Sequence, residues 1–328
     1  MQPTGNIEEQ ILKYREITKS SLKAYTTSLR MLNKALGNDI SEELTLDFLN
    51  NFEDVKNIID NLKSVPTKKN RLTAILVALQ AQKEFDEKLV EKYNTYLNSL
   101  SKKYQELQET QEKTQKQKDN WIEFSDFIQI INDIMKDVKA KKKDWKGLEK
   151  LDKKDYNLLQ SLVLLSTFKE FPIRNNFSDM RVLSSSEYND MKEEEKDAGN
   201  YLLKDKGKYV FKINKYKNVK RLGRRSYNVP KSLAKIYNLF FKFNKSGYFL
   251  TLQNQITPLS SNSLTKLLQK VTFQRSGKKL GSSMLRHIQI SFDRKDKQSI
   301  AEAKAADLKV EDKYLHSAKV NELYQKVA

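Results

Sequence analysis

The chain has 328 residues, of which 61 are Lys or Arg and 42 are Asp or Glu, so it carries a net charge of +19 at pH 7. A chain of this length suggests two domains, and a positive field of this size attracts polyanions, which makes nucleic acid the leading partner. The absence of cysteine excludes disulfides and thiolate metal sites, two histidines exclude a His-rich zinc site, and no apolar stretch approaches the roughly 20 residues of a membrane span.

Helices are expected throughout the first hundred residues. Thr18 offers an N-cap, and apolar side chains recur at helical spacing over 22–36 until Gly37 stops the pattern. Two shorter helices are expected over 44–52 and 55–62. This pattern predicts a helical domain over residues 1–100.

A further helix of this domain is expected to open at Pro66 and to run towards Phe85. Its first turn is basic, with Lys68, Lys69 and Arg71. Cations at a helix N-terminus oppose the helix macrodipole, so another interaction must compensate them. A DNA phosphate is the compensation that we expect, which makes this a DNA-binding domain.

The next segment, residues 101–120, is almost wholly polar and is predicted to be a linker, either an exposed helix or a disordered segment. Hydrophobic order returns at Trp121 and continues at helical spacing to Ile134. An apolar helix over 158–168 then leads directly to Arg174. A second domain is therefore expected over 121–328.

Within this second domain, three short segments alternate in the manner of antiparallel strands: 201–203, 208–213 and 225–229. Helical patterns return afterwards over 233–243, 261–273, 283–291, 299–307 and 320–327. The predicted fold class is mainly α with a small antiparallel β-sheet, in two domains.

Five residues in the second domain carry suitable chemistry for breaking a DNA strand, in the order Arg174, Lys217, Arg286, His316 and Tyr324. Phosphodiester cleavage needs a nucleophile, positive groups at the non-bridging oxygens and a proton donor for the leaving oxygen. The fork of an arginine binds two oxygens at once, and a lysine carries a transferable proton. A tyrosine phenolate both attacks and leaves readily, so the bond energy is kept for religation, and no metal is needed.

Four motifs surround these residues. They are Phe171-Pro172-Ile173-Arg174-Asn175-Asn176, Tyr216-Lys217-Asn218-Val219-Lys220-Arg221-Leu222-Gly223, Met284-Leu285-Arg286-His287, and Leu315-His316-Ser317 followed by Tyr324. In these motifs, over roughly residues 8–328, the chain resembles the tyrosine recombinase (phage integrase) family, and specifically its divergent branch in virophages and large DNA viruses of eukaryotes.

This resemblance implies a helical core-binding domain followed by a catalytic domain. It also implies two catalytic arginines, Arg174 and Arg286, a catalytic Lys217, an assisting His316 and a Tyr324 nucleophile. The implied activity is exchange of double-stranded DNA by a homo-tetramer on paired sites, through a 3′-phosphotyrosyl intermediate and without cofactor or metal.

The chain departs from the family pattern at several positions. Ser283 replaces the usual His three residues before the second arginine, so Ser283 and His287 are candidates for accessory roles. Phe177 stands where an acidic residue is usual, with Asp179 as a possible substitute. Leu315 replaces the customary Gly before the histidine, and the spacing from His316 to Tyr324 is eight residues, one short of the commonest arrangement.

Some assignments stay open at this point. Lys217 shares its turn with Lys215, Lys220 and Arg221, any of which is an alternative. Tyr314 competes with Tyr324, although it lies only two residues from His316. His287 has a packing role as its alternative to a phosphate contact.

Basic residues are the candidates for contacts with the DNA backbone, which position a protein without reading sequence. They are Lys68, Lys69, Arg71, Lys141, Lys142, Lys143, Lys220, Arg221, Arg224 and Arg225. The alternative for each is a solvated surface charge.

Two other functions remain open. One is an enzyme like the type IB topoisomerases, and the other is a catalytically inactive DNA-binding relative. The N-terminal residues 1–5 show no apolar core of a signal peptide, so we expect an intracellular protein in the compartment of its target DNA.

Overall fold

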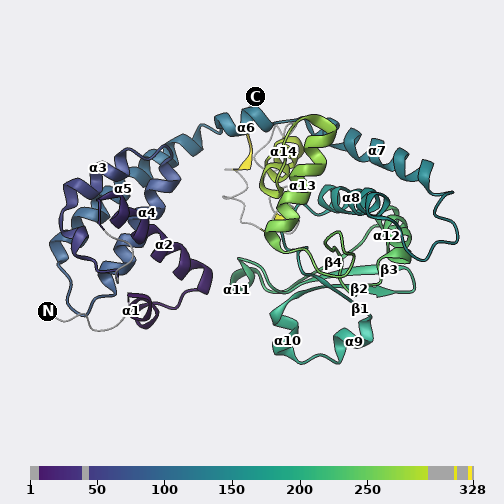
Figure 1. Cartoon of the computed structure of the whole chain (residues 1–328), viewed down its shortest axis with the longest axis horizontal. Coiled ribbons are helices and arrows are strands. Elements are labelled where there is room, and N and C mark those ends of the chain that lie inside the picture. The colour runs from purple at the N-terminus through teal and green to yellow at the C-terminus, as the bar shows by residue number, and fades with distance from the viewer. Residues whose placement is uncertain (1–6, 39–43, 295–313, 316–323, 327–328) are drawn as a thin grey trace. The chain divides into compact units, whose positions relative to one another are not determined.

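The computed structural model describes residues 7–38, 44–294, 314–315 and 324–326. The chain divides into two compact units, Met1–Thr110 and Gln111–Ala328. In Figure 1 the first unit is coloured from purple to blue, and the second runs through teal and green to yellow. The division lies inside the segment 101–120 for which a linker is predicted. Residues up to Glu109 of that segment belong to a long helix.

The first unit is helical in its described residues. Its elements are α1 (Ile7–Tyr14), α2 (Lys19–Ala35), the 3₁₀ helix η1 (Asp47–Asn50), α3 (Phe52–Asp60), α4 (Val65–Gln80) and α5 (Glu87–Glu109). The second half of α4 is buried on every side, because α1, α2, α3 and α5 all pack against it. A helix that is apolar all round is the expected centre of such a bundle.

One helix start in this unit, that of α2, lies in the segment predicted to cap it. The Thr18 side chain accepts a hydrogen bond from the Ser21 amide at 3.2 Å, which confirms the predicted start of α2. The single helix predicted over 44–52 is wrong, because the Asn51 side chain accepts from the Asp54 amide and starts α3 there. Only the short η1 remains of that prediction.

The second unit combines helices with one sheet. Its helices are α6 (Gln115–Asn120), α7 (Phe124–Lys141), α8 (Lys153–Glu170), α9 (Ser185–Asn189), α10 (Glu193–Ala198), α11 (Val219–Leu222), α12 (Lys231–Phe243), α13 (Ser261–Ser276) and α14 (Ser282–Arg294). The predicted helices over 158–168, 233–243, 261–273 and 283–291 are confirmed as α8, α12, α13 and α14. The predicted helix over 299–307 lies outside the described residues, as does most of that over 320–327.

The sheet contains β1 (Arg181–Leu183), β2 (Asn200–Asp205), β3 (Lys208–Ile213) and β4 (Arg225–Asn228), in that spatial order. β2, β3 and β4 confirm the three predicted strands and pair antiparallel. A fourth strand, β1, was not predicted and pairs parallel to β2, so the sheet is mixed. A parallel pair needs a crossover, and α9 and α10 provide it.

The core of this unit lies between α8, α12 and the sheet (Figure 1). α8 is buried along most of its length because α7, α12 and α13 pack against it. Phe177, Phe211 and Phe249 stack edge-on between these layers, with ring centres 5.2 to 6.1 Å apart. These packed rings hold the end of α8 in place, and the candidate site begins in the loop that follows this helix. No described helix is long and apolar enough to cross a membrane.

Candidate active site

Arg174 is placed by the loop that follows α8. The Phe171 amide donates to the Thr167 carbonyl at 2.8 Å and ends the helix. Pro172 and Ile173 are buried behind it, so the chain turns outwards at Arg174, which is half-buried. Pro172 cannot continue a helix, and the residue before a proline avoids helical angles, which explains the sharp exit.

Arg286 lies on α14 and is completely buried, with 0 % of its surface exposed. Its Nη2 donates to the Tyr314 carbonyl at 3.3 Å, and its guanidinium carbon lies 4.8 Å from the ring centre of Tyr324. Burial lowers the pKa of Arg286 to about 10, so the group stays charged at neutral pH. A buried charge is costly unless an anion or hydrogen bonds compensate it.

Tyr324 is half-buried and lies against both arginines. Burial alone raises the pKa of a tyrosine, but here the charge of Arg286 and the hydrogen bond and charge of Arg174 act in the opposite direction. A hydrogen bond from Ser283 lowers the pKa further, and the net pKa of Tyr324 is below its ordinary value. Tyr324 is thus the tyrosine whose phenolate its surroundings favour.

These residues border one cavity of about 470 Å³. The cavity is lined by Arg174, Asn175, Asn176, Ser261, Ser282, Ser283, Arg286 and Tyr324. Ser261 and Ser282 are the first residues of α13 and α14, so two helix N-termini meet the cavity together with two arginines. Backbone amides and the macrodipole favour anions at such termini. The site therefore combines groups that favour an anion with a tyrosine hydroxyl.

Tyr314, the competing tyrosine, has a different environment. Its side chain is 1 % exposed, and its hydroxyl donates to Asp293 Oδ2 at 3.0 Å. Burial and the neighbouring carboxylate raise the pKa of Tyr314 strongly. Its phenolate is disfavoured, and Tyr314 does not line the cavity.

His287 contacts Tyr324 rather than the cavity. Its ring stacks on the Tyr324 ring with centres 4.4 Å apart, and its Nδ1 lies 2.7 Å from the Tyr324 carbonyl oxygen. Burial lowers the pKa of His287 to about 4, so the ring is neutral at pH 7. His287 packs against the tyrosine and is not among the cavity residues, whereas Ser283 is.

Lys217 lies in the turn between β3 and β4 and is exposed. The structure does not bring it into the cavity. The turn itself is anchored beside the site, because Asn218 Nδ2 donates to the Leu315 carbonyl at 3.0 Å, next to the Tyr314 carbonyl that Arg286 contacts. The alternatives Lys215, Lys220 and Arg221 are exposed as well.

His316 lies outside the described residues, but its neighbour Leu315 is described. Leu315 has φ 56°, in the left-handed region that glycine adopts most readily. This backbone conformation gives a physical reason for the glycine that is customary in the family at this position. Leu315 adopts it while its side chain stays buried.

Phe177, which stands where the family has an acidic residue, is fully buried in the aromatic core. Asp179 is exposed and accepts a hydrogen bond from Ser178. Neither residue lines the cavity. Phe177 thus packs in the core, where an acidic residue would have provided a carboxylate.

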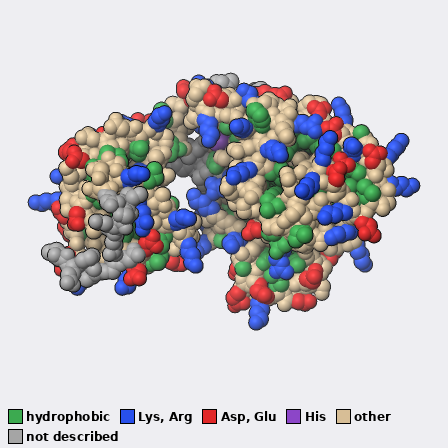
Figure 2. Space-filling model, viewed as in Figure 1, with side chains coloured by type: hydrophobic (Ala, Val, Ile, Leu, Met, Phe, Trp, Pro, Cys, Tyr) green, Lys and Arg blue, Asp and Glu red, His purple; other side chains and the backbone are tan. Residues whose placement is uncertain are grey.

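The candidate DNA contacts fall into two groups. Lys142, Lys143, Lys220 and Arg221 are exposed. Figure 2 shows Lys and Arg side chains scattered over the visible face, with Asp and Glu between them. Others have partners within the protein. Lys68 donates to the Asp60 carbonyl, Lys69 lies over the Tyr104 ring, Arg71 contacts Met31, and Arg224 pairs with Glu193 and Asp197. Arg225 is half-buried on β4.

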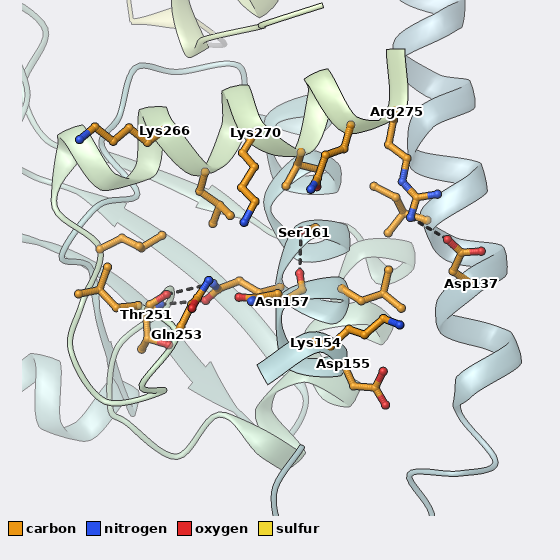
Figure 3. A pocket seen from close by; sticks show the side chains of 18 of the residues that line it. Asp137, Lys154, Asp155, Asn157, Ser161, Thr251, Gln253, Lys266, Lys270 and Arg275 are labelled. Carbon is orange, nitrogen blue, oxygen red and sulfur yellow. Dashed lines mark hydrogen bonds and ion pairs between the residues drawn. The ribbon is translucent and has the colours of Figure 1, made fainter. Parts of the chain in front are cut away.

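A second, larger cavity of about 800 Å³ lies between α7, α8 and α13 (Figure 3). Lys270 of α13 and Ser161 of α8 face it from opposite sides, and Arg275 pairs with Asp137 at 2.7 Å. Lys141 lines it, but neither the two arginines nor the tyrosine of the smaller cavity does.

The sequence alone did not identify Asn175, Asn176, Ser261 or Ser282 as site residues. Asn175 and Asn176 follow Arg174 directly, and Asn175 Nδ2 donates to Ser261 and to Thr265 Oγ1 at 2.7 Å. The run of serines at the starts of α13 and α14 is a signal for caps. Their convergence on one cavity depends on the tertiary fold. Among the described residues, no group of three or more His, Asp or Glu is placed to hold a metal ion.

Among the comparisons with known proteins, the one with solved structures finds matches. No family model matches the chain, and no curated protein matches it. A solved structure described as the crystal structure of XerA recombinase matches over 98 % of this chain and 94 % of that chain, with 9 % sequence identity and a TM-score of 0.38.

Proposed function

We propose that this protein is a DNA strand transferase of the tyrosine recombinase type. The observation that carries the proposal is the cavity in which Arg174, Arg286 and Tyr324 meet. Two positive groups beside a tyrosine of lowered pKa are what attack on a phosphodiester requires.

In the proposed reaction, the Tyr324 phenolate attacks the scissile phosphorus. A bond forms between the phenolic oxygen and phosphorus, and the bond from phosphorus to the 5′ oxygen breaks. The leaving 5′ oxygen takes a proton from Lys217, and a 3′-phosphotyrosyl linkage remains on the protein. Attack by a 5′ hydroxyl of another strand reverses these steps and releases Tyr324.

The two arginines have a shared role in this reaction. Each guanidinium binds non-bridging oxygens and stays charged while negative charge grows on them. The first turns of α13 and α14 add backbone amides at the same place. These groups and a lysine donor supply what the transition state needs, so the reaction requires no cofactor.

The remaining assignments extend this proposal. His316 assists proton transfer, residues 1–100 bind DNA as the core-binding domain, and residues 121–328 form the catalytic domain. The partner is double-stranded DNA, held by a homo-tetramer on paired sites, in the compartment where that DNA lies. The virophage and large-virus branch is part of the same proposal and rests on the motifs alone.

The test is a covalent-adduct trap. Wild-type protein, Tyr324→Phe and Tyr314→Phe are incubated with fragments of the genome that encodes the chain, quenched in detergent, and protein-linked 3′ ends are sequenced. We expect adducts with wild type and Tyr314→Phe and none with Tyr324→Phe. Adducts that survive Tyr324→Phe refute the assigned nucleophile.

Two other outcomes identify the alternatives. Salt-sensitive binding without any adduct identifies an inactive DNA-binding relative. Relaxation of any supercoiled DNA by the monomer, without paired sites, identifies an enzyme like the type IB topoisomerases.

A further inference from the structure

Asn200, at the start of β2, joins two segments that carry proposed catalytic residues. Its Nδ2 donates to the Asn176 carbonyl at 3.1 Å and to the Lys215 carbonyl at 3.0 Å. Its Oδ1 accepts from the amides of Asn214 at 2.9 Å and Lys215 at 2.8 Å. One side-chain amide thus binds the loop of Arg174 and the chain that enters the turn of Lys217.

The hydrogen-bonding capacity of this amide is fully used. An asparagine side chain offers two donors and one carbonyl oxygen with two acceptor positions, and Asn200 makes four bonds. All four partners are backbone groups, so the contacts do not depend on the mobility of other side chains. Asn176 Nδ2 adds a further bond to the Lys215 carbonyl at 3.2 Å.

Other contacts also hold the chain on both sides of these bonds, since Tyr216 packs against the core and donates to the Gly223 carbonyl at 2.6 Å. Asn214 is buried and donates to the Tyr188 hydroxyl at 2.8 Å and the Lys196 carbonyl at 2.9 Å, which holds the end of β3. Lys215 and Lys217 are both exposed. Among these contacts, Asn200 is the side chain that bonds both to the loop of Arg174 and to the start of the lysine turn.

We propose that Asn200 is a positioning residue that holds the turn carrying Lys217 at a fixed place relative to Arg174. This inference rests on the proposed function. It gives Asn200 no contact with DNA: its effect passes through the proton that Lys217 donates to the leaving 5′ oxygen.

The substitution Asn200→Asp tests this role with almost no change of shape. It replaces the Nδ2 donor by an oxygen that faces the carbonyls of Asn176 and Lys215, so two attractions become repulsions. Asn200→Ser is a milder second variant, because it replaces the two amide donors by one shorter hydroxyl and introduces no charge. Asn200→Ser is expected to keep the native fold, and thermal unfolding checks this.

A change of leaving group in the DNA substrate distinguishes a positioning role of Asn200 from a purely structural role. In ordinary DNA the breaking bond leaves a basic 5′ alkoxide, which needs a proton. In DNA with a 5′-bridging sulfur at the scissile position, the breaking bond leaves a thiolate, which is stable unprotonated near neutral pH because a thiol pKa is about 8.5. A defect in proton donation therefore slows the oxygen substrate and leaves the sulfur substrate unaffected.

Adduct formation is measured with both substrates for wild type, Lys217→Ala, Asn200→Asp and Asn200→Ser, with the scissile position taken from the adduct map. We expect Lys217→Ala to slow the oxygen substrate by ~10²-fold or more, in line with general acid catalysis. We expect the Asn200 variants to slow it by up to ~10²-fold, as for a misplaced catalytic group. All variants should match wild type on the sulfur substrate.

Asn244→Asp is the matched control. Asn244 Nδ2 also donates to two backbone carbonyls, those of Tyr248 and Phe249, but Asn244 caps the end of α12 and has no bond to the lysine turn. The same chemical change there should lower the unfolding temperature without a difference between the two substrates.

The outcomes separate the two proposals. Equal slowing of both substrates by Asn200→Ser, or no slowing of either, overturns the positioning role. An Asn200 defect rescued by sulfur while Lys217→Ala is not rescued moves the donor to another group of the turn and overturns the role as stated. A wild-type protein that forms no adduct with either substrate refutes the proposed function itself.

Discussion

The guanidinium carbon of Arg286 lies 4.8 Å from the ring centre of Tyr324, and no part of the Arg286 surface is exposed. A buried cation beside a phenol stabilises the phenolate, since charges interact more strongly away from water. The same burial penalises the cation when the tyrosine is neutral. Under the proposed chemistry, a bound phosphodiester would offset that penalty, so anion binding and activation of the tyrosine would be linked through one arginine.

Arg286→Met is expected to leave the fold intact and to abolish strand cleavage. Burial of a charge is costly, and an unbranched apolar side chain fills much of the same space without that cost. Loss of a group that stabilises transition-state charge typically costs ~10²–10³-fold in rate. Circular dichroism melting and adduct rates check the two parts. A variant that melts far below wild type would show that the charge holds the site together.

Ser283→Ala is expected to move the pH dependence of cleavage to higher pH. The reactive form is the phenolate, and the hydrogen bond from Ser283 lowers the pKa of Tyr324. Removing that bond raises the pKa of Tyr324, so the cleavage rate should begin to rise at a higher pH. Single-turnover cleavage rates of both proteins are measured from roughly pH 6 to pH 10, up to the ordinary tyrosine pKa of about 10. Thr at the same position keeps a hydroxyl and should preserve the profile.

His287 is expected to make the protein less stable in mild acid. Burial lowers its folded pKa to about 4 from the ordinary value of 6.5, so the unfolded chain binds more protons between these values. Stability therefore rises with pH across this window, and its full value is present above about pH 6.5. As the pH falls from 6.5 to 4, the unfolding temperature of wild type should therefore fall by more than that of His287→Phe, and the difference between the two should change. A constant difference would contradict a neutral, buried imidazole.

Leu315→Gly is expected to destabilise the protein in spite of the left-handed backbone. Relief of the positive φ is worth roughly 1–2 kcal/mol. Loss of a buried leucine side chain costs about 2–5 kcal/mol, and the larger effect decides the sign. Denaturant unfolding measures the balance, and a higher midpoint for the variant would mean that backbone strain dominates.

Arg221→Ala and Arg224→Ala are expected to affect DNA binding differently. Arg221 is exposed, whereas Arg224 pairs with Glu193 and Asp197. Loss of one phosphate contact reduces the salt slope of binding by about 1. We expect that reduction for Arg221→Ala only. Titrations of a duplex at several salt concentrations compare the two, and equal slopes would remove Arg221 from the interface.

Much of the fold follows from local patterns in the sequence. The periodicity of apolar residues predicted α2, α8, α12, α13 and α14, because each buries one face or more in a core. The last part of α5 was assigned to a linker, since Leu100 is its last buried residue and the helix runs on to Glu109 in solvent. β1 was missed because three residues are too few to show alternation.

The candidate site was only partly predictable. Arg174, Arg286 and Tyr324 stand in recognisable motifs, and the fold brings them to one cavity. Ser261 and Asn200 carry no such signal, since a serine at a helix start and an asparagine in a strand are ordinary in any protein. Their significance depends on neighbours that are far away along the chain, and sequence spacing does not encode that proximity.

The position of Tyr324 in the chain order has a consequence during synthesis. Arg174 and the first turns of α13 and α14 leave the ribosome before Tyr324 does. Under the proposed chemistry, a nascent chain therefore acquires the groups that bind the phosphodiester before it acquires the group that attacks it. A chain that stops short of Tyr324 would lack the nucleophile and could not break a strand.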